Sequence, residues 1–213
     1  MSDPHARARA RLGRMPDAAA WRHIAEAGDL DATVQRMRDN GLNLWVGTLP
    51  RSPDVPVIEK TLLQGAISLA RDVKRWLAKD GLRTSRWLDQ IAQAGDGFDL
   101  DRWLRAFSML RPSASRPGER ATERLHHLVE THLQDIREAR RRLRQAADPG
   151  VLDVDIQWRL REKLAGDMRG LLGGYPFNAG FFLIYAMLEL LQFERCRALL
   201  VARAHRWDAG GVL

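Results

Sequence analysis

Residues 177–206, FNAGFFLIYAMLELLQFERCRALLVARAHR, constrain the fold more than any other stretch of this sequence. They contain no proline, and between residues 181 and 191 the only charged side chain is Glu189. A helix that is apolar on every side is normally buried between other elements. The apolar run is shorter than the roughly 20 residues of a membrane span, and charged residues follow it at once. We therefore predict a central core or subunit-interface helix, with Asn178 as its N-cap.

Almost every other segment repeats its apolar residues at the three- and four-residue spacing of a helix. We expect further helices at residues 17–27, 30–39, 57–79, 84–94, 100–110, 119–147 and 154–172. The proline-containing residues 42–56 are predicted to form a loop. No segment shows the alternation of a strand. The predicted fold class is therefore all-α, a helical bundle built from short helical-hairpin modules and three or four long helices.

The segment PSASRPG at residues 112–118 has the composition of a linker. It would separate an N-terminal helical module, residues 1–112, from a C-terminal long-helix module, residues 119–213. The alternative is that the two modules form one continuous domain.

Two short segments resemble each other. WRHIAEAGDLDATVQRM begins at Trp21, and WLDQIAQAGDGFDLDRWL begins at Trp87. Each predicts a helix, a Gly-Asp stop and a second, Asp-capped helix that begins with Leu-Asp. This similarity predicts two related helical-hairpin modules. The alternative is that any two capped helix pairs look alike.

Composition limits the classes of protein to which this chain can belong. Its single cysteine, Cys196, excludes an intrachain disulfide or a paired-cysteine zinc site and indicates a reducing cytoplasm. The N-terminus MSDPHARARA lacks the apolar core of a secretory signal. The net charge of +7 permits an acidic protein, a nucleic acid or an anionic membrane surface as partner. Nearly all the basic residues are arginine, and a bias towards arginine codons accounts for that excess without phosphate recognition.

The most basic pattern is a stripe at helical spacing, formed by Arg137, Arg140, Arg141 and Arg144. It is a candidate partner-binding surface, and it could bind phosphates with a steep dependence on salt. The acidic residues Asp135 and Glu138 are interleaved with it, which favours a solvated or partner-facing helix surface.

Two further groups of residues are candidates for special chemistry. Glu189 and Arg197 are candidate buried polar residues, and a buried carboxylate such as Glu189 is expected to pair with an arginine from another helix. His126 and Glu130 are four residues apart, as in helical metal sites, with His132 nearby, but no third ligand is identifiable. No phosphate-binding loop and no set of nucleophile and base can be argued. We predict a non-catalytic protein without a metal or cofactor.

Three stretches resemble the C/d subunit of V-type and archaeal A-type rotary ATPases. The first is the leader ARARARLGRM at residues 6–15, followed by AEAGDLDATVQRMRD. The second is Ile58-Glu59 with Leu62, followed by FDLDRWLRAF at residues 98–107. The third is IYAMLELLQFERCRALLVAR at residues 184–203. The chain departs from the family where two glutamates of its last helix fall on Leu190 and Gln192, and where an asparagine falls on Arg102. It is also shorter than ordinary members, which contain three similar modules.

The resemblance implies a role. The C/d subunit is a non-catalytic helical connector on the cytoplasmic end of the membrane rotor ring, where it receives the tip of the central stalk in an enzyme that transports protons or sodium ions. The implied partners are ring and stalk subunits, and the implied location is cytoplasmic, peripheral to the inner face of the cell membrane. The oligomeric state stays open. The alternative is an arginine-rich helical protein that binds nucleic acid or acts as a protein–protein adaptor.

Overall fold

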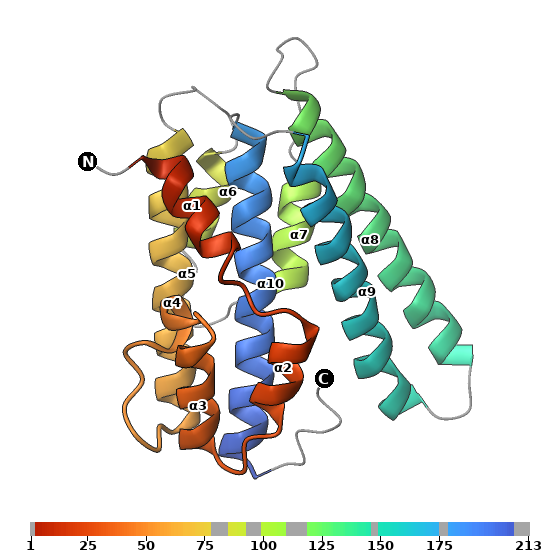
Figure 1. Ribbon diagram of the computed structural model, residues 1–213. Helices are drawn as coiled ribbons and strands as arrows, with labels where there is room; N and C mark the ends of the chain where they lie inside the picture. The colour runs from red at the N-terminus through yellow and green to blue at the C-terminus, as the bar shows by residue number, and fades with distance from the viewer. Residues whose placement is uncertain are drawn as a thin grey trace. The chain divides into compact units, whose positions relative to one another are not determined.

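The computed structural model describes residues 3–77, 85–92, 99–109, 119–145, 149–174 and 179–206. These residues form ten α-helices and no strand (Figure 1), which confirms the predicted all-α class. Six helices are short: α1 (Pro4–Leu12), α2 (Ala18–Ala25), α3 (Leu30–Asp39), α4 (Asn43–Val46), α6 (Ser85–Ala92) and α7 (Leu100–Ser108). Four are long: α5 (Val55–Leu77), α8 (Glu119–Gln145), α9 (Pro149–Leu172) and α10 (Ala179–Ala204).

The chain divides into two compact units. Unit 1 comprises Met1–Leu69 and Gln192–Leu213, and unit 2 comprises Ala70–Leu191. The boundaries therefore fall inside α5 and inside α10. The predicted linker at residues 112–118 lies outside the described residues, and unit 2 includes residues on both sides of it.

Aspartate caps fix the starts of the short helices. Asp29 Oδ1 accepts a hydrogen bond from the Ala32 amide at 2.7 Å, and Asp99 Oδ1 accepts one from the Asp101 amide at 2.9 Å. Each satisfies an amide that has no partner within its own helix, which contributes about 1 kcal/mol. Both caps were expected from the repeated Leu-Asp motif. The expected cap at Asn178 lies outside the described residues.

Several helix boundaries differ from the sequence expectation, helix α1 was not predicted, and proline explains one of the differences. The segment at residues 42–56 was predicted to be a loop, but it contains the single turn α4 and the start of α5. Helix α9 begins at Pro149 rather than at Val154. Proline is well suited to the first position of a helix, because its missing N–H has no helical acceptor there.

Unit 1 is centred on the C-terminal half of α10. The Trp21 indole N–H donates to Gln192 Oε1 at 3.0 Å, and Trp45 meets Phe193 edge to face with ring centroids 5.5 Å apart. On α5, a Cβ added to Gly65 would lie 2.8 Å from the Leu44 carbonyl oxygen and 2.9 Å from the Trp45 ring. Helix α5 therefore packs against the backbone of α4 at a distance that only glycine permits.

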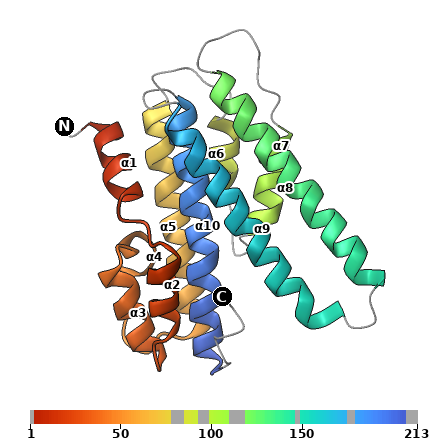
Figure 2. The ribbon, with the colours of Figure 1, turned by 45° about the vertical axis from the view of Figure 1, so that its right-hand side comes forward.

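Unit 2 contains the apolar half of α10. Every residue from 181 to 191 is buried, and Glu189 is the most accessible of them, at 6% exposure. Trp76 lies 5.3 Å from Phe182 and 6.0 Å from Tyr185, measured between ring centroids. The prediction that this stretch forms a core helix is confirmed. Figure 2 shows the other long helices of the unit, α8 and α9, as an antiparallel hairpin, in which many residues of the two helices meet. Among the described residues, no helix combines the length and the apolar character needed to cross a bilayer.

Arginine side chains bind carbonyl groups at or near the C-terminal ends of two short helices of unit 1, α2 and α4. Arg203 donates to the carbonyl of Ala25 at 2.5 Å and Arg36 to that of His23, both in the last turn of α2. Arg38 donates to the carbonyl of Leu49 at 2.7 Å and to that of Val46, the last residue of α4, at 3.4 Å. The last carbonyls of a helix lack partners within it and carry partial negative charge, so a guanidinium group stabilises them.

Two glycines inside long helices test the packing of α5. We expect Gly65→Ala to destabilise the protein by about 1–3 kcal/mol, because the new methyl group meets backbone and an indole ring. The matched control is Gly166→Ala in α9, where a Cβ would have no atom within 4 Å. That change should stabilise by about 0.5–1 kcal/mol through helix propensity. Urea unfolding measures both, and equal effects of the two substitutions would contradict the close contact at Gly65.

Candidate functional site

The predicted arginine stripe lies on α8, but its arginines have different partners and do not form one basic surface. The Arg140 guanidinium turns to Asp101 on α7, with Nη2 3.2 Å from Oδ2. Arg141 binds Glu138 through two hydrogen bonds of 2.9 Å, whereas Arg137 is exposed. The side chain of Arg144 lies outside those that the structure describes. The stripe therefore divides into one arginine that serves the fold and an exposed, mixed-charge surface.

Glu138 keeps this surface from being uniformly positive. Its carboxylate accepts hydrogen bonds from Arg141 and also from Arg142, at 2.9 Å. These two hydrogen bonds, from Arg141 first, lower the pKa of Glu138 to about 2, and the same contact raises the pKa of Arg141. Glu138 is therefore ionised at any physiological pH, and it partly neutralises the two arginines beside it.

A buried ion-pair cluster centred on Asp101 was not foreseen. Asp101 lies in the first turn of α7 and is 6% exposed. Its oxygens are 3.2 Å from Arg140 Nη2, 3.4 Å from Gln157 Nε2 and 3.5 Å from Arg161 Nη2. A buried carboxylate is tolerated only when it is paired, and here the partners come from both α8 and α9. Asp101 thus joins α7 to the α8–α9 hairpin inside unit 2, and the cluster is called the Asp101 cluster below.

The repeated Leu-Asp motif was the one sequence signal for this cluster. Asp31 follows Leu30 as Asp101 follows Leu100. Asp31 is exposed, however, and accepts hydrogen bonds from the Ser52 amide at 2.6 Å and from the Ser52 hydroxyl at 3.1 Å. The motif marks an aspartate that fastens its helix to a later segment, but it does not say which copy is buried.

His132 lies beside the Asp101 cluster on the inner side of α8 and is 4% exposed. Burial is the main cause that lowers its pKa from 6.5 to about 4, and Arg161 lowers it further. Asp101, Asp135 and a hydrogen bond with the Leu160 backbone act in the opposite direction. His132 is therefore neutral at pH 7. Its Nε2 atom has no hydrogen-bond partner among the described residues.

The two candidate metal ligands, His126 and Glu130, contact each other. His126 Nδ1 lies 3.6 Å from the Glu130 carboxylate, and its Nε2 lies 2.5 Å from the Ser108 carbonyl oxygen. Both ring nitrogens are thus directed at groups of the protein. Within the part of the chain that the structure describes, no three His, Cys, Asp or Glu side chains are placed to hold a metal ion.

The two candidate buried polar residues of α10 belong to different units. Glu189, in unit 2, is buried and interacts with other groups of the protein. Arg197, in unit 1, is half-buried, and its Nε donates to both oxygens of Glu59 on α5, at 2.8 and 2.9 Å. The Glu59–Arg197 pair fastens α5 to α10 within unit 1.

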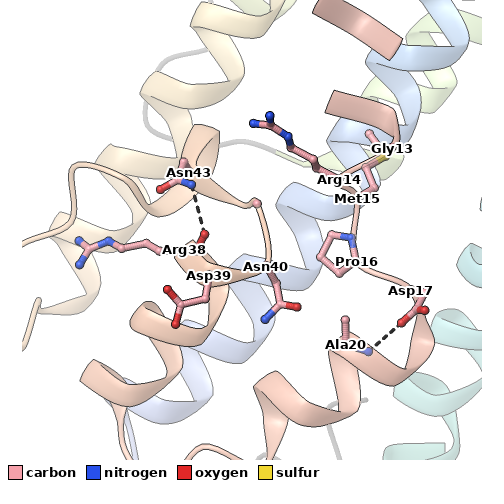
Figure 3. A pocket seen from close by; sticks show the side chains of 11 residues that line it. Gly13, Arg14, Met15, Pro16, Asp17, Ala20, Arg38, Asp39, Asn40 and Asn43 are labelled. Atoms are coloured by element: carbon pink, nitrogen blue, oxygen red, sulfur yellow. Dashed lines mark hydrogen bonds between the residues drawn. The ribbon is translucent and has the colours of Figure 1, made fainter. Parts of the chain in front are cut away.

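Unit 1 also has an open cavity of about 520 Å³ (Figure 3), which lies between the α1–α2 turn and the α3–α4 turn. Gly41 in its wall has a φ of +83°, and a Cβ there would lie 2.8 Å from the Arg14 carbonyl oxygen. Asn43 donates to the Arg38 carbonyl at 3.2 Å, and Asp17 accepts from the Ala20 amide at 2.8 Å; Figure 3 draws both bonds. Two of the polar side chains around the cavity, those of Asn43 and Asp17, are therefore bonded to backbone groups of its own walls.

No family model, curated protein or solved structure matches this chain. The resemblance to the C/d subunit family therefore depends on the three stretches of this sequence.

The first prediction from the site concerns the charge on Asp101. Asp101→Asn should destabilise the protein on the order of 3 kcal/mol, because it removes the buried negative charge that faces the guanidinium groups of Arg140 and Arg161. The control is Asp31→Asn at the exposed copy of the motif, which should cost about 1 kcal/mol or less. Chemical denaturation compares the two variants with the parent protein. Equal losses would show that the Asp101 cluster is not a buried ion pair.

The second prediction concerns the loss of stability at acidic pH. Between pH 6.5 and pH 4 the unfolded chain binds a proton at residue 132 that the folded protein does not bind. Stability should therefore fall as the pH falls through this window, by at most about 1.4 kcal/mol per pH unit from this histidine. His132→Gln should flatten the pH dependence, whereas His127→Gln, at an exposed position of the same helix, should not. Urea unfolding at pH 7 and at pH 5 gives the change in the free energy of unfolding between the two pH values. The same change in the two variants would contradict the role of His132 in the pH dependence.

The third concerns the Glu59–Arg197 pair. A double-mutant cycle with Glu59→Gln and Arg197→Gln should give a coupling of about 0.5–1 kcal/mol at low salt, because solvent screens half-exposed charges. Salt at about 1 M should reduce it. The control cycle uses Asp72→Asn and Arg75→Gln, a pair with a longer separation of 3.8 Å in which Arg75 is exposed, and for it we expect almost no coupling. A coupling at Glu59–Arg197 no larger than in the control would contradict the pairing.

Proposed function

We propose that this chain is a non-catalytic connector subunit of a V/A-type rotary ATPase, which links the central stalk to the membrane rotor ring. The observation that carries the proposal is the resemblance in three stretches of the sequence. The contact between two of these stretches supports it. Glu59 belongs to the second and Arg197 to the third, and their side chains are bonded at 2.8 Å.

The construction of each unit suits a part that transmits torque. Such a part must resist deformation, and close-packed interiors have low compressibility. In unit 1 the indoles of Trp21 and Trp45 are almost completely buried against α10, and in unit 2 the Asp101 cluster joins three helices. The ion pairs of Asp101 with Arg140 and Arg161 add polar cross-links between these helices.

Charge indicates what kind of surface the connector meets. The net charge of +7 favours docking on acidic protein surfaces and near anionic head groups. In the proposal the chain lies at the cytoplasmic face of the membrane and is held there by ring and stalk subunits. The coupling ion, proton or sodium, is a property of the ring.

The nucleic-acid alternative has less support. Of the four arginines in the stripe, Arg140 is bonded to Asp101 and Arg141 to Glu138. An ionised glutamate within the stripe repels a polyanion. Among the described residues, large apolar side chains are exposed only at Val57 and Met109, and neither supplies the aromatic platform on which single-stranded bases stack.

The test is purification of the tagged full chain, produced at its native level, from detergent-solubilised membranes of its own cells. We expect ring and central-stalk subunits to co-purify, as identified by mass spectrometry. The control is Leu188→Asp, which places an unpaired charge at a position with 0% exposure and should disrupt the fold. Because this variant keeps the arginines and the tag, equal recovery with both chains would reveal non-specific adsorption.

Two outcomes would overturn the proposal. One is a preparation from which ring and stalk subunits are absent. The other is a preparation in which nucleic acid is the main component and is released by salt with a steep power dependence, which would favour the alternative. A second readout is ATP-driven ion uptake by membrane vesicles, which should fall when the gene is deleted and recover when the chain is restored.

A further inference from the structure

We draw no further inference here: the strongest candidate, the open cavity of unit 1 between the α1–α2 turn and the α3–α4 turn, is lined by Asp17, Arg38, Asp39, Asn40 and Asn43, whose side chains are already hydrogen-bonded within the unit, and nothing in the structure shows what covers it.

Discussion

The burial of α10 is the constraint on which the rest of the structure depends. Residues 181–191 have no face that water can solvate at low cost, and each large side chain buried there contributes roughly 1.5–3 kcal/mol. Other helices must therefore surround this stretch. Both units use α10: unit 2 takes the apolar half, and unit 1 takes the half that begins at Gln192. The polar groups of the second half are matched individually, Gln192 by the Trp21 indole and Arg197 by Glu59.

The arginine content has a structural explanation. Arg36, Arg38 and Arg203 bind carbonyl groups at or near the ends of short helices. A planar guanidinium group with five donors can reach such carbonyls at the end of a long side chain, and it stays charged when partly buried. Arg195 lies over the Trp21 ring at 5.3 Å, an arrangement that the ring quadrupole favours. A basic chain of this kind therefore does not need a polyanion as partner.

The sequence predicted those parts of the fold that depend on local pattern. Apolar periodicity located the long helices, and the Asp-capped starts at Asp29 and Asp99 are properties of a few neighbouring residues. The single turn α4 was missed because its four residues are too few to show a period. The Asp101 cluster was missed because its partners, Arg140 and Arg161, are 39 and 60 residues away in the chain. Which side of α7 is covered depends on tertiary packing, which the local motif does not encode.

The two segments that begin at Trp21 and Trp87 share some contacts and differ in others. In both modules a buried tryptophan finds an acceptor for its indole N–H, Gln192 for Trp21 and the Trp103 carbonyl for Trp87. The second aspartate differs in its surroundings, because Asp31 is exposed and Asp101 is the centre of a buried cluster. Residues common to both copies maintain a hairpin that packs on long helices. The positions at which the two segments differ, of which this aspartate is one, therefore give each segment its own contacts.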